Sequence, residues 1–183
     1  TDLGGTAGGQ SDVLIVYATA TANATNVVNF TALNTTQNNS TDANNAVLTS
    51  KDGENTTIDV SAATGSSGAF TLTGGTGQDS LTGGAGADII SGGGDDDTIY
   101  INASGEGDSD VMDGGTGSDT LQVSTGTHTF SSNGNLSNIS TILADVSGSI
   151  INLDGQNEGF TITGNNGDDT FTVGAGSDTI TDL

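Results

Sequence analysis

Apolar residues recur along this chain at the spacing of very short strands. Leu81, Ile90 and Ile99 follow one another at intervals of nine residues, and each is the middle residue of a triplet that ends in a polar side chain. Alternate side chains of a strand point to opposite faces, so each triplet predicts a three-residue strand with its middle side chain directed inward.

Two longer segments, residues 17–57 and 124–150, are rich in Asn, Thr and Ser but keep alternating apolar positions. In the first of them these positions include Val27, Phe30 and Leu33. The alternation predicts further strands joined by long polar loops.

One stretch has a different period. Between Leu136 and Val146, the residues Ile139, Ile142, Leu143 and Val146 recur at helical spacing. This spacing predicts a short helix or a loop that plugs one end of the core.

Six-residue turns dominated by glycine separate the triplets, which gives a repeat of nine residues. Three copies run in tandem from Gly74, Gly83 and Gly92, and a fourth begins at Gly114. A degenerate copy carrying four extra residues ends in Asp110-Val111-Met112, and two more copies lie at 164–172 and 173–181. The sixth position of the seven copies is always aspartate: Asp79, Asp88, Asp97, Asp110, Asp119, Asp169 and Asp178.

Glycine supplies the φ > 0 conformations that a tight turn requires, so each nonapeptide predicts half of one coil. Two halves make a coil of 18 residues with a turn on each edge, and coils stack at a strand spacing of about 4.8 Å. Asp79, Asp97 and Asp119 are then expected on one edge, and Asp88 and Asp110 on the other. Carboxylates this close repel one another unless a cation lies between them. Oxygen ligands in flexible turns favour Ca²⁺ over Mg²⁺.

The tandem nonapeptides resemble those of the repeats-in-toxin (RTX) family of calcium-binding proteins, and about a third of the chain lies in recognisable copies. The resemblance implies an all-β fold, a right-handed parallel β-roll or β-helix. It also implies several Ca²⁺ ions between successive turns, held by the sixth-position Asp and by turn carbonyls. The candidate carbonyl donors are the first and third turn positions: Gly74, Thr76, Gly83, Ala85, Gly92, Gly94, Gly114, Thr116, Gly164 and Asn166.

Five further acids are candidate ligands because they lie in or beside such turns: Asp12, Asp95, Asp96, Asp108 and Asp168. Asp12 is included because Ser11-Asp12-Val13 echoes Ser118-Asp119-Thr120. Asp95 replaces the glycine of the fourth turn position. For Asp95 and Asp96 the sequence leaves two alternatives open, extra ligands or exposed acids.

The charge balance of the 183 residues narrows the function classes. Lys51 is the one basic side chain against 23 acidic ones, and the formal net charge is -22. Nucleic-acid binding is excluded because it needs Lys and Arg to neutralise phosphates, and a basic membrane-surface helix is excluded for the same reason. No stretch approaches the roughly 20 apolar residues of a spanning helix. Cysteine is absent, so thiolate metal sites are excluded too.

No catalytic motif is found, and we expect no enzyme activity. The one histidine, His128, lies in a stretch of alternating polar strand and is expected to be exposed, which argues against a Ser-His-Asp arrangement. The sequence has no Gly-x-Ser-x-Gly elbow, no His-Glu-x-x-His motif and no phosphate loop with lysine.

Internal echoes predict two β-roll units, residues 1–105 and 106–183. Ile58-Asp59-Val60 followed by Phe70-Thr71-Leu72 is echoed by Ile151-Asn152-Leu153 followed by Phe160-Thr161-Ile162. The residues Thr-Asp-Leu occur at both ends of the chain, so we expect a segment of a longer tandem array. Open sheet edges at each end would be covered by neighbouring repeats or by identical subunits.

The expected function is an extracellular calcium-binding structural module of a surface-layer protein, an adhesin or a self-assembling matrix fibre. The resemblance implies export in the unfolded state, through a type I secretion route, to the bacterial surface. Cell-surface polysaccharide is a candidate partner. The alternative is the calcium-dependent C-terminal module of a secreted enzyme. An ice-binding or other ligand-binding face is disfavoured, because the third turn position varies among Thr, Ala, Gly and Asn and predicts no flat array.

Overall fold

The computed structural model describes residues 15–16, 22–32, 36–39, 46–64, 68–102, 109–144 and 147–181. In these residues every strand pair is parallel, and no helix occurs. The expected all-β parallel roll is therefore confirmed. None of these segments forms a helix long and apolar enough to cross a membrane.

The strands form two long sheets and two short ones. The six-stranded sheet contains β2 (Ala22–Val27), β5 (Ala46–Ser50), β7 (Thr71–Thr76), β9 (Ile89–Gly94), β11 (Val111–Thr116) and β14 (Leu136–Ser137). The eight-stranded sheet contains β3 (Asn29–Thr31), β6 (Thr57–Asp59), β8 (Ser80–Thr82), β10 (Thr98–Ile101), β12 (Thr120–Val123), β15 (Thr141–Ala144), β17 (Thr161–Thr163) and β19 (Thr179–Thr181). The three-stranded sheet contains β13 (Gly126–Thr129), β16 (Ser149–Asn152) and β18 (Thr170–Thr172), and β1 (Ile15–Val16) pairs with β4 (Gln37–Asn38).

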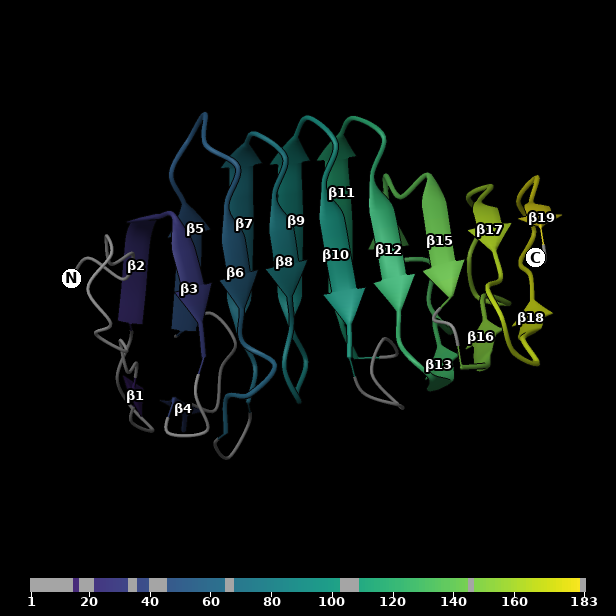
Figure 1. The fold of residues 1–183 in the computed structure, drawn as a ribbon, viewed down its shortest axis with the longest axis horizontal. Helices are drawn as coiled ribbons and strands as arrows, with labels where there is room; N and C mark the ends of the chain where they lie inside the picture. Colours follow the sequence, from purple (N-terminus) through teal and green to yellow (C-terminus); the bar gives the residue numbers. More distant parts are fainter. Residues whose placement is uncertain are drawn as a thin grey trace.

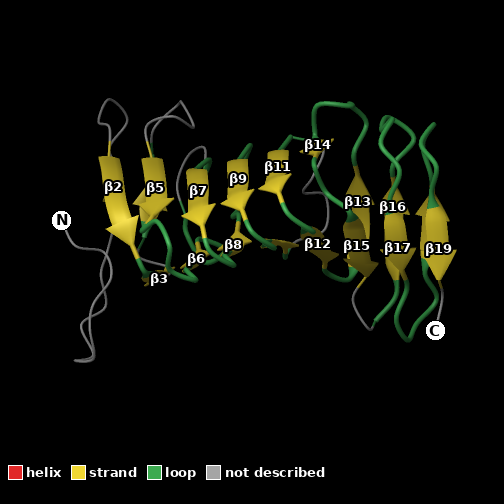
Figure 2. Cartoon of the chain, turned by 90° about the horizontal axis from the view of Figure 1, so that it is seen from above, coloured by secondary structure: helices red, strands yellow, loops and turns green. Residues whose placement is uncertain are grey.

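The chain alternates between the two faces of the roll as it advances along the long axis. In Figure 1 the eight-stranded sheet lies in front with its strands running downward, and the six-stranded sheet lies behind it with its strands running upward. Seen from above in Figure 2, the three-stranded sheet continues the line of the six-stranded sheet toward the C-terminus. The expected 18-residue coil is present between Asp79 and Asp97, which occupy equivalent positions 18 residues apart.

The core is a stack of inward side chains, one or two from each strand. In the eight-stranded sheet, Leu81, Ile99, Leu121, Ile142 and Ile162 are aligned in register and fully buried. Leu48, Leu72, Ile90, Met112 and Leu136 form the facing stack in the six-stranded sheet. Each such side chain contributes about 1.5–3 kcal/mol by leaving water. The middle residue of each triplet therefore points inward, as the sequence predicts.

The two Asn/Thr/Ser-rich segments contain the expected strands, including β2, β3 and β5 in the first and β13 to β16 in the second. Val27 and Phe30 are buried in the core. Leu33, residue 105, the Thr-Asp-Leu sequence at residues 1–3, and Asp182 and Leu183 of the one at the other end lie outside the described residues.

The prediction of a helix or loop plug between Leu136 and Val146 is wrong for the part that the structure describes. Leu136 begins β14, and residues 141–144 form β15 with strictly alternating half-buried and buried side chains. Ile142 continues the core stack beside Leu121. The apparent helical spacing arises because a tight turn at Asn138 joins two short strands, and Ile139 in the turn and Ile142 on β15 are both buried.

That turn is possible because Asn138 has a φ of 54°, in the left-handed region that asparagine tolerates better than most residues. Its side-chain amide donates a hydrogen bond of 2.8 Å to Oδ1 of Asp113 on the preceding coil. The chain therefore reverses direction in a few residues, and the two strand periods on either side of the turn combine to imitate a helical one.

The prediction that His128 is exposed is also wrong. His128 is fully buried on β13, where it pairs in register with Ile151, and Ile151 pairs with Phe171. Its Nε2 lies 3.0 Å from the carbonyl oxygen of Ser124. The polar neighbours Thr127 and Thr129 point outward, so His128 occupies the inward position of the strand. Because it is enclosed in the core, His128 is not accessible to a substrate at the surface.

The outer face of the eight-stranded sheet corrects a third expectation, that no flat array of side chains repeats. The variable positions are in the turns, whereas the first outward position of the strands is Thr or Ser on β6, β8, β10, β12, β15, β17 and β19. A hydroxyl-bearing row therefore runs along this face. The sequence comparison of turn positions could not reveal it.

The C-terminal end of the roll leaves core positions open. Ile180 on β19 is aligned with the fully buried Ile162 on β17, yet Ile180 is 48% exposed. β19 and β18 are the last strands of their sheets. In the described part of the chain, nothing packs on this end.

Candidate metal centre

A ladder of hydrogen bonds joins the sixth-position aspartates of successive coils. The main-chain N–H of Asp79 donates to Oδ1 of Asp97 at 2.8 Å, and the N–H of Asp97 donates to Oδ1 of Asp119 at 2.9 Å. The ladder begins at Thr56, whose N–H donates to Oδ1 of Asp79 at 2.7 Å. Asp79, Asp97 and Asp119 therefore lie on one edge of the roll, as expected from their spacing.

The second carboxylate oxygen of these residues is buried and has no hydrogen-bond partner. This holds for Oδ2 of Asp79, Asp97 and Asp119, and also for Oδ2 of Asp169 and Asp178 near the C-terminus. A buried carboxylate oxygen without a partner costs several kcal/mol if the group is ionised. Each of these five atoms therefore needs a cation or a proton.

Glycine at the first turn position makes room for this oxygen. A methyl group added at Gly74 would lie 2.6 Å from Oδ2 of Asp79 and closer still to the carbonyl oxygen of Gly92. The same two kinds of oxygen, from Asp97 and Gly114, crowd the corresponding position at Gly92. A carboxylate oxygen and a main-chain carbonyl of the next coil thus converge at each of these turns.

Burial affects the ionisation of the same groups. Desolvation raises the pKa of Asp79 to about 6 and that of Asp97 to about 6, although hydrogen bonds from the N–H groups of Thr56 and Asp79 act in the opposite direction. Desolvation also raises the pKa of Asp119. Negative neighbours, among them Asp119 and Asp95, raise the pKa of Asp97 further. A bound cation would reverse these shifts because it favours the ionised form.

The donor set fits Ca²⁺. In the part of the chain that the structure describes, no three Asp, Glu or His side chains converge on one point. Any ion held here must therefore take carbonyl oxygens as well as carboxylates, and a mixed set of oxygen donors in loosely constrained geometry is typical of calcium. The residues that would hold it are the sixth-position aspartates and the carbonyls of the glycine turns. Calcium would supply the positive charge that their buried oxygens lack.

The opposite edge of the roll is built differently. The N–H of Phe70 donates to Oδ1 of Asp88 at 2.7 Å, and the N–H of Asp88 donates to Oδ1 of Asp110 at 2.8 Å. Oδ2 of Asp88, however, accepts a hydrogen bond of 2.8 Å from the N–H of Gly84 in its own turn. Asp88 and Asp110 are buried in the predicted places, but Asp88 already has protein partners for both oxygens.

The two edges also differ in backbone conformation. In the turns that start at Gly74 and Gly114, the second and fourth positions have positive φ, at Gly75, Gly77, Gly115 and Gly117. In the turn that starts at Gly83, only the fourth position, Gly86, does. The nine-residue sequence pattern is therefore folded into two turn shapes.

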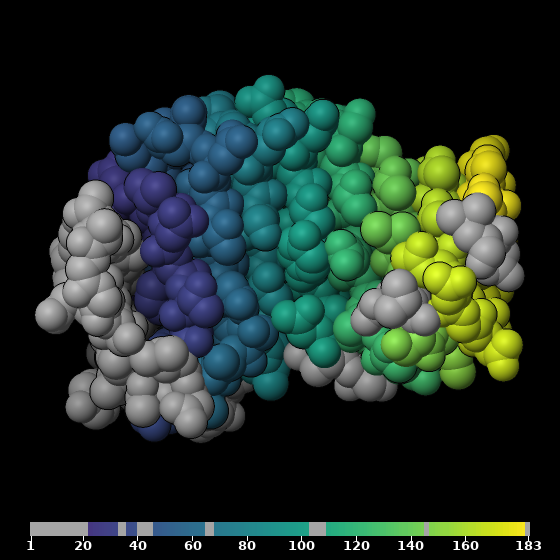
Figure 3. Space-filling view, in the orientation of Figure 1, coloured from purple at the N-terminus to yellow at the C-terminus, as the bar shows by residue number. Residues whose placement is uncertain are grey.

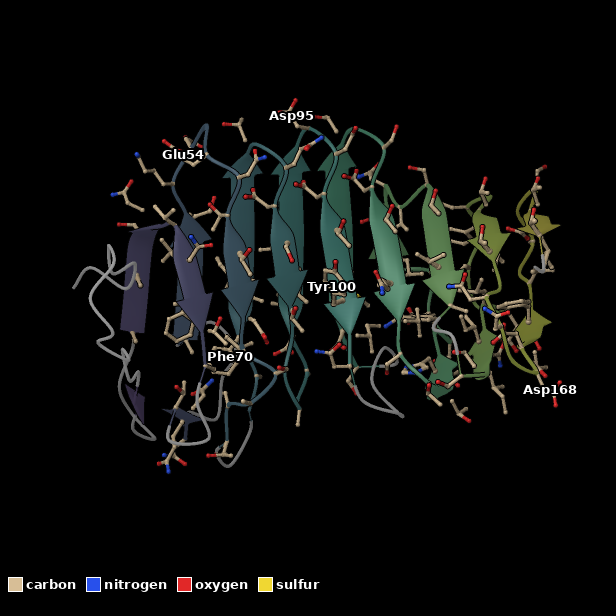
Figure 4. All side chains as sticks on the ribbon, in the orientation of Figure 1. Glu54, Phe70, Asp95, Tyr100 and Asp168 are labelled. Atoms are coloured by element: carbon tan, nitrogen blue, oxygen red, sulfur yellow. The ribbon has the colours of Figure 1, made fainter. Side chains whose placement is uncertain are left out.

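Asp95 and Asp96 lie at the outer end of their turn. Both side chains are exposed, and Asp95 has a φ of 72° at a position where the other turns have glycine. Oδ2 of Asp95 accepts a hydrogen bond of 3.2 Å from the N–H of Gly77, and Oδ1 of Asp96 accepts one of 2.8 Å from the N–H of Ser118. These acids connect neighbouring turns at the surface, and Figure 4 shows Asp95 at the outer end of its turn.

The carboxylates of the C-terminal turns make the same kind of contacts as Asp97, although in the turn that starts at Gly164 only the fourth position, Gly167, has a positive φ. Oδ1 of Asp169 accepts a hydrogen bond of 2.6 Å from the N–H of Ser149, and Oδ1 of Asp178 accepts one of 2.9 Å from the N–H of Phe160. Gly164 is buried, whereas Asn166 and Asp168 are exposed at the outer part of their turn.

The remaining candidates divide into three groups. Thr76 does not present a free carbonyl, because its carbonyl oxygen and its hydroxyl both accept from the N–H of Gly53 at 2.9 Å. Ala85 and Thr116 are exposed turn residues, and Gly94 is half-buried. Asp12 and Asp108 lie outside the described residues.

Two amide side chains that the sequence analysis did not select take part in the same coil-to-coil contacts. Asn135 is buried, and its Nδ2 donates to the carbonyl oxygen of Asp110 at 2.9 Å. Gln156 is fully buried, and its Nε2 donates to the carbonyl oxygen of Phe130 at 3.0 Å. The signal that could have found them is position, because each lies in a turn between two short strands. The side-chain N–H groups of these amides join neighbouring coils directly, whereas Oε1 of Gln156 is buried without a hydrogen-bond partner.

Comparison with known protein families agrees with this geometry. The family model of the RTX calcium-binding nonapeptide repeat matches the chain in four copies, over residues 64–99, 103–122 and 161–181. Searches of curated proteins and of solved structures found no match.

Proposed function

Since the chain belongs to the RTX family of calcium-binding β-roll proteins, we propose that it is an extracellular structural module whose coils lock together when Ca²⁺ binds. The observation that carries this proposal is the set of buried, partnerless Oδ2 atoms of Asp79, Asp97, Asp119, Asp169 and Asp178. If the fold depended on its apolar core alone, burial of these five carboxylate oxygens without partners would only destabilise it.

Calcium then acts as a folding switch. A ligand that binds only the folded state stabilises it by RT ln(1 + [L]/Kd), so the extracellular ion concentration favours the roll and a low cytosolic concentration favours the open chain. RTX repeats typically occur in secreted proteins. A chain that stays open inside the cell and folds outside suits export through a narrow channel, which supports the proposed type I route.

A structural role is favoured over a catalytic one by the use of the acidic groups. The buried aspartates are committed to coil-to-coil hydrogen bonds, and His128 is enclosed in the core. Figure 3 shows the segments following one another in sequence order along the long axis, an arrangement suited to a spacer or a repeat unit in a surface layer, an adhesin or a matrix fibre.

The open C-terminal end supports stacking against a further coil. Ile180 is exposed at a core position, and β19 has an unpaired edge in the described structure. Exposed edges are normally covered. A neighbouring repeat or a second copy, adding a parallel strand to β19, would bury Ile180 and extend the ladder beyond Asp178.

The test is a calcium titration of the chain followed by circular dichroism and light scattering, with Mg²⁺ as the control. We expect β-sheet signal to appear with Ca²⁺ and not with Mg²⁺, and scattering to increase if copies stack end to end. Complete β-sheet signal in chelator would refute the folding switch. Calcium-induced folding without any scattering change would refute end-to-end stacking of this chain alone.

A further inference from the structure

The outer face of the eight-stranded sheet carries an unbroken row of hydroxyl groups. In register on seven successive strands lie Thr57, Ser80, Thr98, Thr120, Thr141, Thr161 and Thr179. Neighbouring strands are about 4.8 Å apart, so the row offers hydroxyl groups at a regular interval along the long axis of the roll. None of the seven hydroxyls makes a hydrogen bond to another described residue.

Beside the middle of this row lies a group of larger side chains. Tyr100 on β10 is adjacent to Gln122 on β12, and Gln122 is adjacent to Leu143 on β15. All three are half-buried and point outward. A hollow of about 60 Å³ is lined by Tyr100, Ile101, Asn102, Gln122, Val123 and Ser124. Figure 4 shows Tyr100 near the middle of this face.

The face is almost without charge, although the whole chain has a net charge of -22. Among the outward side chains of β6 to β19 in this sheet, Asp59 alone is charged, and its carboxylate accepts a hydrogen bond of 2.9 Å from the N–H of Ser61. The acids are in the turns at the two edges. A cationic partner would be attracted to those edges, so the face itself suits an uncharged partner.

An aromatic ring beside an amide and a row of hydroxyls matches the chemistry of a neutral sugar chain. Sugars present apolar ring faces that pack on an aromatic side chain, and hydroxyl groups that exchange hydrogen bonds with amides and alcohols. Ordered water is less well matched, because Tyr100, Gln122 and Leu143 interrupt the flat surface that an extended water lattice would need.

We propose that this face binds an uncharged polysaccharide lying along the long axis of the roll. The ring of Tyr100 packs against a sugar ring, and Gln122 and the hydroxyls of Thr98, Thr120 and Thr141 bind its hydroxyl groups. The proposal rests on the calcium-folded module, because the row is continuous only when the coils are stacked.

The test uses the folded chain in excess Ca²⁺, with circular dichroism as the check of folding for every variant. Binding is measured by pull-down on cellulose and chitin and by retardation in gels that contain dextran, amylose or galactomannan. Two variants alter the face, Tyr100→Ala and Thr120→Lys. The matched control is Thr73→Lys, which changes an outward threonine on the six-stranded sheet.

We expect wild type and Thr73→Lys to bind at least one of these neutral polysaccharides, and both face variants to lose at least tenfold in affinity. The proposal is overturned if the folded wild type binds none of the five, or if Tyr100→Ala and Thr120→Lys bind as well as wild type. Inhibition of ice recrystallisation without polysaccharide binding would also overturn it, in favour of ordered water. If wild type fails to fold in Ca²⁺, the proposal of calcium-induced folding is wrong, and this result is distinct from a folded protein that binds no polysaccharide.

Discussion

The main-chain N–H of Asp79 donates to Oδ1 of Asp97, 18 residues further on, at 2.8 Å. The same carboxylate is therefore tied to the neighbouring coil by one oxygen, while its other oxygen is buried without a partner. One residue thus connects the hydrogen-bonded stack to the need for a cation. Because the two oxygens have different roles, we expect substitutions of Asp97 and changes of pH to affect calcium affinity and the stability of the calcium-free fold in opposite directions.

Replacement of Asp97 by asparagine should weaken calcium binding but stabilise the calcium-free fold. The amide keeps an acceptor for the N–H of Asp79 and removes the buried charge, whereas calcium loses a carboxylate ligand. We expect at least a tenfold loss of calcium affinity, which is about 1.4 kcal/mol, in a titration followed by circular dichroism.

Asp95→Asn is the matched control, since Asp95 is an exposed acid in the same turn. It should leave the calcium midpoint within about twofold of wild type, as surface substitutions usually change stability by less than about 0.5 kcal/mol. Equal effects of the two substitutions would show that net charge, rather than the buried oxygen of Asp97, determines calcium affinity.

The stability of the calcium-free fold should decrease as the pH rises from about 4 to about 6. The pKa of Asp79 and of Asp97 is raised from 3.8 in the unfolded chain to about 6 in the fold. In that interval the folded state holds protons that the unfolded state has released, so a higher pH favours unfolding. Urea unfolding in chelator at pH 4.5 and at pH 7 measures the free energy of unfolding, which should be larger at pH 4.5.

Calcium binding should show the opposite trend, because the ion binds the deprotonated carboxylates. The calcium midpoint should rise as the pH falls below about 6. A midpoint that is independent of pH between 5 and 7 would contradict the assignment of Asp79 and Asp97 as buried ligands.

Gly92→Ala should abolish or strongly weaken calcium-induced folding, because the added methyl group collides with Oδ2 of Asp97 and with the carbonyl oxygen of Gly114. Gly94→Ala, two residues away, is the control. At Gly94 the nearest described atom to an added methyl group is Oγ1 of Thr116 at 3.5 Å, an ordinary contact. Calcium titrations of both variants test this, and a folding defect as large in Gly94→Ala would contradict it.

Gln156→Ala should destabilise the fold to a similar degree with and without calcium, by about 1–3 kcal/mol. Its amide donates to the carbonyl oxygen of Phe130, and no cation is needed for that contact. Asn157→Ala, at an exposed neighbouring position, should have little effect. Thermal unfolding of both variants in Ca²⁺ and in chelator gives the comparison, and a Gln156→Ala defect confined to the calcium-bound state would oppose this role.

The nonapeptide period predicted the placement of Leu81 and Ile99 in the core and of Asp79 and Asp97 on one edge, because strand alternation and coil length fix both. It could not predict that Asp88 satisfies its second oxygen within its own turn, since the two turn shapes share one sequence pattern.

Outside the nonapeptides, local patterns were misleading. His128 has polar neighbours that suggested a solvent-exposed strand, but its position opposite Ile151 is set by pairing with a strand more than 20 residues away. The row of hydroxyls on the eight-stranded sheet likewise depends on register between coils of unequal length, which no single window of sequence contains.

The most direct test of the central claim is hydrogen exchange of the main-chain N–H groups of Asp79 and Asp97 in Ca²⁺, in Mg²⁺ and in chelator. Both groups donate to the carboxylate of the following coil. If calcium closes the turns, these N–H groups should be strongly protected in Ca²⁺ and should exchange rapidly in Mg²⁺ and in chelator. Equal protection in all three conditions would contradict the claim that calcium holds the coils together.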